Sequence, residues 1–529
     1  MMRFKQNYFW HVSVIILGLA IGLVHHIYIY PHFFHADSAA YQVLASAIKD
    51  EGSLLPRDFI YGNQLIMLKI SPFIALASSI GFIGYKAYAI GGALAICFWF
   101  YVCSIITSKY FKSNTLAVVL TTCLFIPFGI DDIDFLLGQE SHLSNVVLSI
   151  MICLPIIMYI QEDKKAYLAL SALATFLMTS ESPIRSLIVL APFILFIAIV
   201  FSSRKSFISI AVVTIAFLLG KASNSCLLST HFPLKVDYSQ LSSLIAPGSV
   251  IDNLLNIFKS ILVRSSSADL SSGFNVSSLL TPFYFLGLLY IVLLIVALSY
   301  GLKVFIELMI HKTSTQPAFS REGLLCALGA VGFIFGLILV ASLNPDSGRH
   351  IFWATCLLKI SVFSIVYIVI SRYISKNTIA LTLTLLVALG MSALPSTFYE
   401  TKLKPFNYAK LNINSDINKK IKETVKSTGI KYIYGEDFWR MQLLNSMDFD
   451  VHSAELTEFH MKGVIPRDWL TRPSWYCKNE DVLYYTKNGI TDSIIVSLLK
   501  ANGGELIYES NEGSIWKGPV IWNTPAWCN

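Results

Sequence analysis

Charged residues are scarce in this chain. Asp, Glu, Lys and Arg make up 14% of the 529 residues, whereas they make up about a quarter of an average soluble protein. Hydrophobic residues account for 55%. This composition excludes a soluble protein and predicts a polytopic membrane protein. The formal net charge is +7, but the basic residues form small clusters between apolar runs. That distribution is typical of membrane topology signals and not of a nucleic-acid site.

The cysteines lack the spacing of a metal site. Seven of the nine lie in or beside apolar runs, where small buried hydrophobic side chains are expected: Cys97, Cys103, Cys123, Cys153, Cys226, Cys326 and Cys356. Only Cys477 and Cys528 lie in polar sequence. They could form a disulfide if that region lies outside the cytoplasm.

The first apolar run lacks a small-residue cleavage site. It covers about residues 12–31 and is long enough to span a bilayer, but too long for the core of a signal peptide. We therefore expect a retained first helix. Arg3 and Lys5 precede it, and basic flanks stay in the cytoplasm, so the segment after it emerges on the outer face.

Ten further runs have spanning length, which gives eleven predicted transmembrane helices with the amino terminus inside and the carboxyl terminus outside. Every inferred inner loop is basic, in agreement with this register. The runs cover about residues 85–107, 115–130, 143–160, 166–180, 186–202, 206–224, 280–302, 323–342, 351–370 and 378–395. Within the first outer loop, residues 38–50 and 62–82 are predicted to form two interfacial helices that do not cross the bilayer.

The composition changes after Pro395. Charges become frequent, and runs such as 431–434 and 493–499 are typical of strands. We therefore predict an all-α membrane domain at 1–396 and a small outer α/β domain at 397–529. No internal repeat is apparent.

Asp37 stands immediately after the first predicted helix, in the sequence His35-Ala36-Asp37-Ser38. An ionisable group at a membrane exit is costly unless it serves an ion, a substrate or a partner. The alternative is that Asp37 only caps a helix beginning at Ser38, because Asp is a favoured N-cap residue.

The predicted topology brings many polar residues of the outer loops to one membrane face. Acids can deprotonate a hydroxyl acceptor, and Arg or His can stabilise a phosphate leaving group. The alternative is that these are solvated loop residues. The residues are Asp37, Asp58, Asp131, Asp132, Asp134, Glu140, His142, Glu181, Arg185, Asp346, Arg349 and His350.

Two smaller groups within this set each have two interpretations. Glu181 and Arg185 could form an ion pair at i,i+4 spacing, or Arg185 could face a phosphate. The trio Asp131, Asp132 and Asp134 could bind a divalent cation or be solvated. In the outer domain, the turn containing Asp437 and Trp439 places an aromatic face beside acids, as in sugar-binding or interdomain turns.

These features together resemble the GT-C superfamily of membrane glycosyltransferases that use polyprenyl-phosphate-linked sugars. The resemblance rests on the first-loop acid, on two interfacial helices ending in PFIALASSIGFIGYKAYAI, on the basic inner loops and on the outer carboxyl-terminal domain. In size and layout the chain is most similar to bacterial O-antigen glucosyltransferases of the serotype-converting kind.

The resemblance implies an inverting transfer of a sugar, with glucose the expected one, at the periplasmic face of the bacterial inner membrane. The donor would be sugar-linked undecaprenyl phosphate, and the acceptor a hydroxyl of O-antigen or a related lipopolysaccharide glycan. Asp37 matches the family's catalytic position and Asp58 could assist. Asp37 itself is not part of an Asp-Asp or Asp-Glu pair, which weakens the expectation of a metal there.

The resemblance also assigns binding roles. Lys86, Arg185 and Arg349 would hold the donor phosphate. The expected substrate-binding residues are Asp131, Asp132, His142, Glu181, His350, Asp437 and Trp439. Two other functions remain open. An O-antigen polymerase or ligase would share these substrates. A flippase or transporter would usually show repeats and ionisable groups near the middle of the membrane.

Overall fold

The computed structural model describes residues 2–62, 64–127, 131–230, 244–257, 282–310, 320–343, 348–375, 415–459, 463–487 and 493–528. The chain forms two compact units. The first comprises Met1–Ile29, Ala93–Cys226 and Asp237–Lys402, and the second comprises Tyr30–Gly92, Leu227–Val236 and Leu403–Asn529. The predicted domain boundary at 396 lies outside the described residues. The segment between the first two predicted spans groups with the carboxyl-terminal residues and not with the membrane helices.

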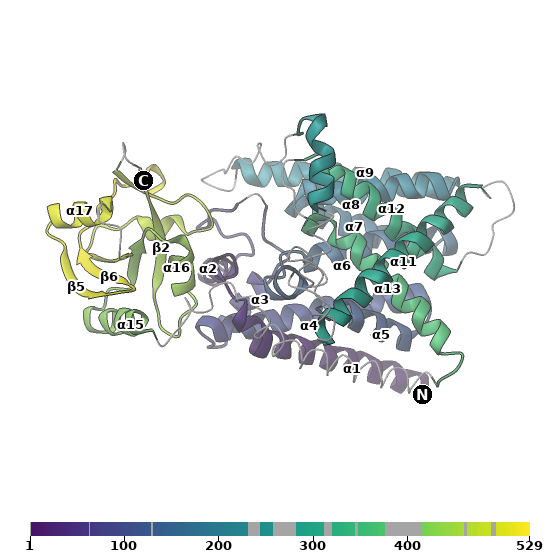
Figure 1. Cartoon of the computed structure of the whole chain (residues 1–529), viewed down its shortest axis with the longest axis horizontal. Coiled ribbons are helices and arrows are strands. Elements are labelled where there is room, and N and C mark those ends of the chain that lie inside the picture. Colours follow the sequence, from purple (N-terminus) through teal and green to yellow (C-terminus); the bar gives the residue numbers. More distant parts are fainter. Residues whose placement is uncertain are drawn as a thin grey trace. The chain divides into compact units, whose positions relative to one another are not determined.

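The first unit is helical (Figure 1). In the described residues, eight helices are long and apolar enough to cross a membrane. The elements are α1 (Met2–Val24), η1 (His25–Ile29), most of α4 (Gly84–Phe111), α5 (Asn114–Leu124), η3 (Asp132–Gly138), α6 (Leu143–Glu162), α7 (Lys165–Glu181), α8 (Pro183–Val200), α9 (Arg204–Thr230), η5 (Pro247–Ser249), α11 (Pro282–Ile310), α12 (Arg321–Ala341), η8 (Gly348–Ile351) and α13 (Phe352–Ile370).

All but one of the predicted spans overlap a helix, and eight of these helices are long and apolar enough to cross a membrane. The exception, 378–395, lies outside the described residues. The span predicted at 115–130 is too long. Helix α5 has 11 residues, because Ser113 caps its start with a side-chain hydrogen bond and Pro127 follows shortly after its end. Helix α7, with 17 residues, is also short for a spanning helix.

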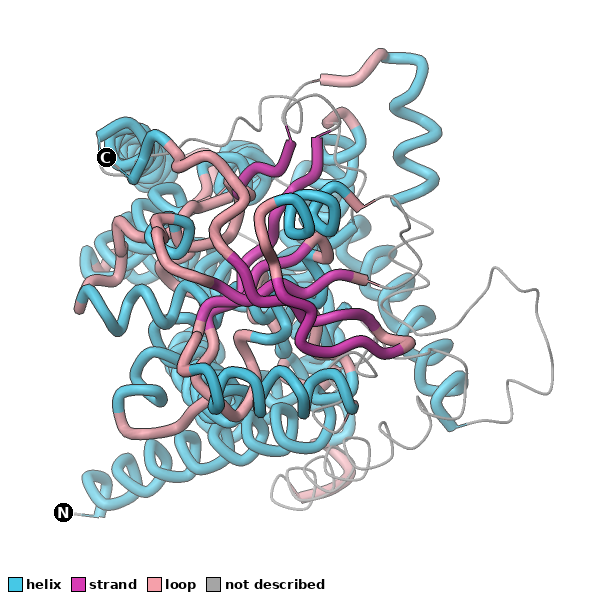
Figure 2. Tube along the Cα trace, turned by 90° about the vertical axis from the view of Figure 1, so that its left-hand side faces the viewer, coloured by secondary structure: helices cyan, strands magenta, loops and turns pink. Residues whose placement is uncertain are grey.

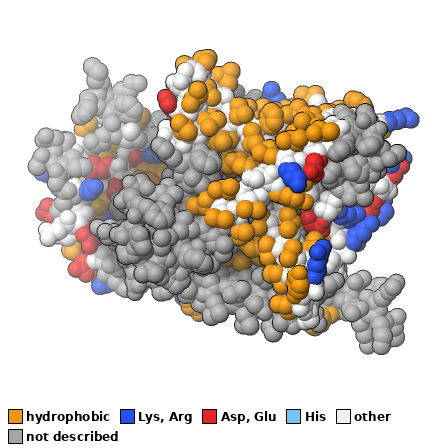
Figure 3. All heavy atoms as spheres, turned by 45° about the vertical axis from the view of Figure 1, so that its right-hand side comes forward, with side chains coloured by type: hydrophobic (Ala, Val, Ile, Leu, Met, Phe, Trp, Pro, Cys, Tyr) orange, Lys and Arg blue, Asp and Glu red, His pale blue; other side chains and the backbone are white. Residues whose placement is uncertain are grey.

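Helices α6 and α12 form the interior of the first unit. In their most apolar windows 89% and 78% of the residues are buried, compared with 28% in α9 and 22% in α11. The exposed side chains of α9 and α11 include Phe207, Leu218 and Ile295. Figure 3 shows hydrophobic side chains gathered over the helices of this unit. Such a surface is suited to lipid.

A glycine on α12 allows close contact with α13. A Cβ atom at Gly332 would overlap the ring of Trp353, so only glycine fits there without a shift. Small residues let membrane helices approach closely in this way. The contact holds the Trp353 indole in place on α13.

The second unit begins with two helices of the first predicted outer loop. After the short η2 (Tyr30–His32), α2 (Ala36–Glu51) packs against α3 (Ser71–Ser79). His35 is the N-cap of α2 and its side chain accepts a hydrogen bond from the Asp37 backbone, while Gly52 ends the helix in the left-handed conformation at φ +64°.

The second predicted interfacial helix is shorter than expected. The sequence predicted a helix over 62–82, but α3 begins only at Ser71. Pro72 lies in its first turn, where a missing backbone N–H is tolerated, whereas it would break a longer helix.

The carboxyl-terminal part of the second unit contains a six-stranded mixed sheet in the order β3-β2-β1-β4-β6-β5 (Figure 2). Strand β1 is central and pairs in parallel with β2 and β4, whereas the outer pairs are antiparallel. The elements are α15 (Asp416–Thr428), β1 (Tyr432–Gly435), α16 (Phe438–Leu444), β2 (His452–Phe459), β3 (Gly463–Pro466), η10 (Pro473–Tyr476), β4 (Val482–Thr486), α17 (Ile494–Ala501), β5 (Glu505–Ser510), β6 (Gly513–Gly518) and η11 (Ala526–Cys528).

One of the two strand predictions in this domain is confirmed and the other is wrong. The run at 431–434 corresponds to β1, but 493–499 lies in helix α17. The Ser493 side chain accepts a hydrogen bond from the Val496 backbone and so caps the helix. Ile495 and Leu499 are its buried residues, at i,i+4 spacing. The cap and this spacing outweigh the β-branched composition of the run.

Candidate functional site

A cavity in the first unit gathers polar side chains from the ends of several helices. The space between the surrounding atoms is about 260 Å3, and this figure includes space that is open to solvent. Residues of α6, α7, α8, η8 and α13 surround it. The lining residues are His142, Asn145, Val146, Ser149, Met178, Arg185, Val189, Arg349, His350, Phe352 and Trp353.

Two arginines reach this cavity from different helix starts. Arg185 lies in the first turn of α8, and its Nη1 donates a hydrogen bond to the Ser141 carbonyl at 3.0 Å. Arg349 lies in η8, and its guanidinium carbon is 5.1 Å from the centre of the Phe135 ring. Stacking of this kind fixes a guanidinium while leaving its edge available for hydrogen bonds.

Two histidines and an aromatic wall complete the polar part of the lining. The rings of His142 and His350 have their centres 5.9 Å apart, and the His142 ring is 5.6 Å from Phe352. His142 sits at the start of α6. The two imidazoles and two guanidiniums therefore come from α6, α8 and η8, which are far apart in the sequence.

The charge of the cavity is one-sided. Among the described residues that line it, two are arginines and none is acidic. A cavity lined by two arginines is electropositive, and this favours an anionic ligand. Guanidinium groups bind phosphate oxygens through paired, charge-assisted hydrogen bonds. The cavity is our candidate functional site.

The acidic segment that the sequence predicted to be an outer loop is buried. Asp131 is 5% and Asp132 is 6% exposed, so the interpretation of solvated loop acids is wrong for these two residues. Asp132 lies 3.4 Å from the ammonium group of Lys359, which is itself buried. Asp134 accepts a hydrogen bond from the Gln139 side chain at 3.0 Å.

No metal site is formed by the described side chains: no group of three or more His, Cys, Asp or Glu among them could hold a metal ion. Glu181 is fully buried at the end of α7. It belongs to the first unit but, like Asp131 and Asp132, is not among the residues that line the cavity. Asp346 lies outside the described residues.

Asp37 belongs to the second unit and lies in the first turn of α2, not at its N-cap. The interpretation that it caps a helix beginning at Ser38 is therefore wrong, because His35 occupies the N-cap. Its side chain is partly exposed, while Ala36 and Ser38 on either side are buried. The positive end of the helix dipole favours a carboxylate in this position.

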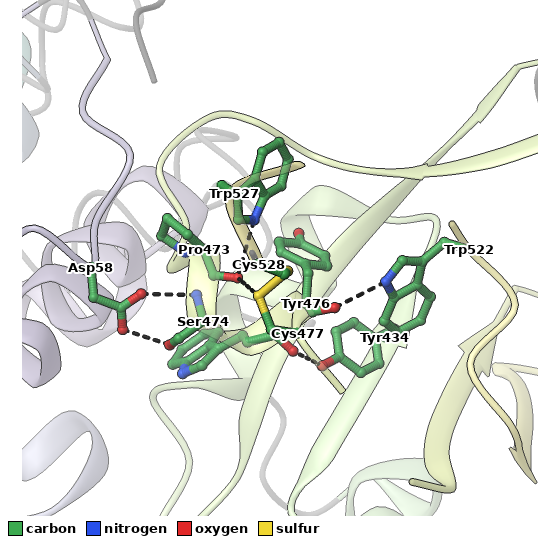
Figure 4. The surroundings of a disulfide bond; sticks show 10 residues. Asp58, Tyr434, Pro473, Ser474, Tyr476, Cys477, Trp522, Trp527 and Cys528 are labelled. Atoms are coloured by element: carbon green, nitrogen blue, oxygen red, sulfur yellow. Dashed lines mark hydrogen bonds between the residues drawn. A yellow bond between two sulfur atoms is a disulfide. The ribbon is translucent and has the colours of Figure 1, made fainter. Parts of the chain in front are cut away.

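Asp58 is held by the carboxyl-terminal part of the same unit (Figure 4). Its carboxylate accepts hydrogen bonds from the Ser474 backbone at 2.8 Å, the Ser474 hydroxyl at 2.6 Å and Arg472 Nε at 2.7 Å. Arg472 also pairs with Asp50 at 2.5 Å. Burial opposes the charge of Arg472, but the two carboxylates raise its pKa above the usual arginine value.

The segment that contains Arg472 and Ser474 is tied to the end of the chain. Cys477 and Cys528 are joined in a disulfide, with their Cα atoms 5.4 Å apart (Figure 4). The indole of Trp527 donates a hydrogen bond to the Pro473 carbonyl at 3.3 Å. The two cysteines of polar sequence are thus the ones that pair.

The remaining predicted residues also belong to the second unit. Lys86 is exposed on α4 and does not line the cavity. Asp437 caps α16 by accepting a hydrogen bond from the Arg440 backbone. Trp439 is 38% exposed, and its ring centre is 5.9 Å from that of His35. It is therefore a surface aromatic beside the start of α2.

Sequence reasoning assigned no role to His26, Lys359 or Arg472. His26 and Lys359 lie within apolar runs. An ionisable residue in such a run indicates a functional or paired group, so the sequence could have pointed to both residues. Arg472 gave no such signal, because its partner Asp58 lies 414 residues away in the sequence.

No protein-family model and no curated protein matches the chain. Among solved structures it is similar to ArnT from Cupriavidus metallidurans in the apo state, with a TM-score of 0.43, 10% identity and coverage of 98% of this chain and 99% of that chain. It is also similar to the same protein bound to undecaprenyl phosphate, with a TM-score of 0.42, 9% identity and coverage of 97% and 99%. Similarity at this level assigns no function to this chain.

Proposed function

We propose that this chain is a membrane glycosyltransferase that moves a sugar from undecaprenyl phosphate to a hydroxyl of O-antigen or a related cell-surface glycan. The observation that carries the proposal is the basic cavity of the first unit. Arg185 and Arg349 meet there with two histidines and with no acid among the described lining residues. A lipid-linked phosphate is an anion that a helix bundle with an apolar surface can receive from the membrane.

The reaction that fits these groups is an inverting displacement at the anomeric carbon. The acceptor oxygen bonds to that carbon while the bond from the carbon to the phosphate oxygen breaks. The family resemblance assigns the role of general base, which takes the proton of the acceptor hydroxyl, to Asp37 of the second unit. Arg185 and Arg349 neutralise the charge that develops on the departing phosphate.

The other groups of the cavity have supporting roles in this proposal. His142 and His350 donate hydrogen bonds to the phosphate or to sugar hydroxyls, and Asn145 and Ser149 orient the sugar. Such a combination of an apolar wall with a few polar groups is typical of specific ligand sites. Trp439 offers an exposed face for a sugar ring of the acceptor.

Asp58 has a different role in this proposal from the one that the family resemblance implies. Both of its oxygens already accept hydrogen bonds from Arg472 or Ser474. A carboxylate bound by an arginine and a serine of a distant segment joins parts of the fold. We therefore assign Asp58 to the attachment of the first loop.

The disulfide supports a periplasmic position for the second unit, because disulfides persist in oxidising compartments. The amino terminus would then be cytoplasmic and the protein would lie in the inner membrane. Glucose as the donor sugar and serotype conversion as the outcome rest only on the size and layout of the chain.

The test is the sugar composition and linkage of the surface glycan in cells with the chain, without it, and with Asp37→Ala. The proposal expects a side-branch sugar that appears with the chain and disappears in the variant, while membrane insertion is unchanged. A fully active Asp37→Ala protein would refute the assigned base. A change only in glycan chain length would indicate a polymerase instead.

A further inference from the structure

Two buried ionisable side chains of the first unit take no part in the proposed reaction. His26 Nε2 lies 3.6 Å from Glu140 Oε1, and neither side chain has any solvent exposure. His26 belongs to η1, directly after α1, and Glu140 follows η3. The imidazole therefore lies against the buried carboxylate, and the two form an ion pair only when His26 is protonated.

The backbone at Glu140 has an unusual conformation. Its φ is +55°, a region that few residues other than glycine adopt. The turn around it is closed by the Phe135 carbonyl, which accepts hydrogen bonds from the His142 backbone at 3.1 Å and from the Ser141 hydroxyl at 3.3 Å. Strained backbone persists where the surroundings hold it in place, and it occurs often at functional sites.

The same turn forms one wall of the basic cavity. The Ser141 carbonyl, next to Glu140, accepts the hydrogen bond from Arg185. The following residue, His142, lines the cavity. A shift of this turn would therefore move both the acceptor that holds Arg185 and the imidazole that faces the ligand.

A second contact ties the same region to the end of the first helix. His25 Nε2 lies 3.1 Å from the Ile133 carbonyl, near the start of η3. His26 contacts Glu140, which follows the end of η3. The two histidines therefore join η1 to both ends of η3. Both elements are π-helices, which are rare and frequent at functional sites.

We propose that His26 and Glu140 are a positioning pair for the donor cavity, a role that rests on the proposed function. The pair holds the turn from Gln139 to His142 in its strained conformation, so that Arg185 and His142 keep the geometry that binds the donor phosphate. Neither residue touches the ligand.

The test is the dissociation constant of undecaprenyl phosphate for the purified full-length chain in detergent, measured by native mass spectrometry with thermal unfolding as a folding control. Glu140→Gln keeps the size of the side chain but removes its charge. We expect it to weaken binding by about tenfold, the order seen when an outer contact that orients a ligand group is lost. His26→Asn should have a similar effect.

Glu140→Gly separates the side-chain contact from the backbone, because glycine adopts the positive φ without strain. The pair requires the carboxylate, so we expect this variant to bind as weakly as Glu140→Gln. The double variant His26→Asn with Glu140→Gln should be no weaker than either single variant, because the two residues act as one unit. The double variant places two neutral amide side chains in the buried site, which tolerate burial together. It can therefore be measured if a single variant fails to fold.

Glu162→Gln is the matched control. Glu162 ends α6, the helix whose start carries His142, and it pairs with Lys164 and Lys112. We expect this variant to bind undecaprenyl phosphate as the wild-type chain does. In assays of transfer, the Glu140 variants should raise the donor KM and change no other kinetic parameter. Wild-type affinity in Glu140→Gln and Glu140→Gly would overturn the positioning role alone, provided that Arg349→Gln loses binding. Failure of the wild-type chain to bind would overturn the proposed function together with this inference.

Discussion

Both units of this protein place arginines beside functionally interesting residues, but in different surroundings. In the second unit, Arg472 lies between Asp50 and Asp58 and its charge is compensated within the chain. In the first unit, Arg185 and Arg349 line a cavity with no acid among its described lining residues. An arginine held between two carboxylates joins parts of a fold, whereas arginines that converge on a cavity are suited to an anion from outside.

The two acids of the first loop for which the sequence predicts catalytic roles, Asp37 and Asp58, also differ in their surroundings. Asp58 is fixed by an arginine, a hydroxyl and a backbone N–H. Asp37, at the start of α2, is partly exposed. The following predictions test whether the two regions have the different roles that these surroundings indicate, beginning with the largest effect.

Replacing Asp37 should have the largest effect on transfer. Asp37→Asn removes the proposed general base, and the rate with a lipid-linked donor should fall by about 10²–10⁴-fold. Asp416→Asn is the matched control, because Asp416 also lies in the first turn of a helix of the second unit. Equal rates in the two variants, measured by release of undecaprenyl phosphate, would mean that Asp37 only stabilises its helix.

The arginines of the cavity should follow. Arg185→Gln and Arg349→Gln should each lower the transfer rate by about 10²–10³-fold, the cost of removing one group that stabilises developing negative charge. Arg349→Lys should lie between, because lysine keeps the charge but loses the planar fork. Arg372→Gln, at an exposed arginine of the same unit, should be unaffected. If Arg372→Gln lowered the transfer rate as much as the cavity variants do, the net charge of the protein alone would explain the effect.

Removal of the disulfide should affect the second unit only. Replacing Cys477 and Cys528 together by Ser should reduce its stability by about 2–4 kcal/mol, since the bond closes a long loop. Limited proteolysis would report this loss. The undecaprenyl phosphate affinity of the cavity should not change, and Cys226→Ser, at an exposed cysteine outside the disulfide, should change neither property. A loss of phosphate affinity in the double variant would contradict the separation of roles.

The ion pairs of Arg472 should contribute less. Arg472→Gln should destabilise the second unit by about 1–3 kcal/mol, because it removes hydrogen bonds to charged groups, while Asp50 can still be solvated. Lys422→Gln breaks an exposed pair with Asp448 in the same unit and should have almost no effect. Limited proteolysis of both variants would compare the stability of the second unit in each. Equal resistance would mean that Arg472 does not anchor the first loop.

The sequence was sufficient for features that depend on neighbouring residues. Spanning helices are recognised from a single apolar run, and the carboxyl-terminal sheet lies in the region that the change of composition indicated. The error at α17 has the same local origin, because a run rich in Ile and Val favours a strand until its Ser493 cap is considered. The length of α5 was missed for a similar reason, since Pro127 was included in the apolar run.

The candidate site could be predicted only in part. The predicted topology placed Arg185, Arg349, His142 and His350 among the polar outer-loop residues at one membrane face, but their meeting around one cavity depends on helix packing that no spacing reveals. The partner of Asp58 could not be found, because residues 414 positions apart are brought together only by the fold. The positive φ of Glu140 likewise has no sequence signal.

The most direct test of the account is a cryo-electron microscopy structure of the full-length protein with undecaprenyl phosphate. We expect density for the phosphate in the cavity of the first unit, within hydrogen-bond distance of Arg185 and Arg349, with Arg472 still paired to Asp58. A phosphate bound elsewhere while this cavity contains only water would contradict the proposed donor site.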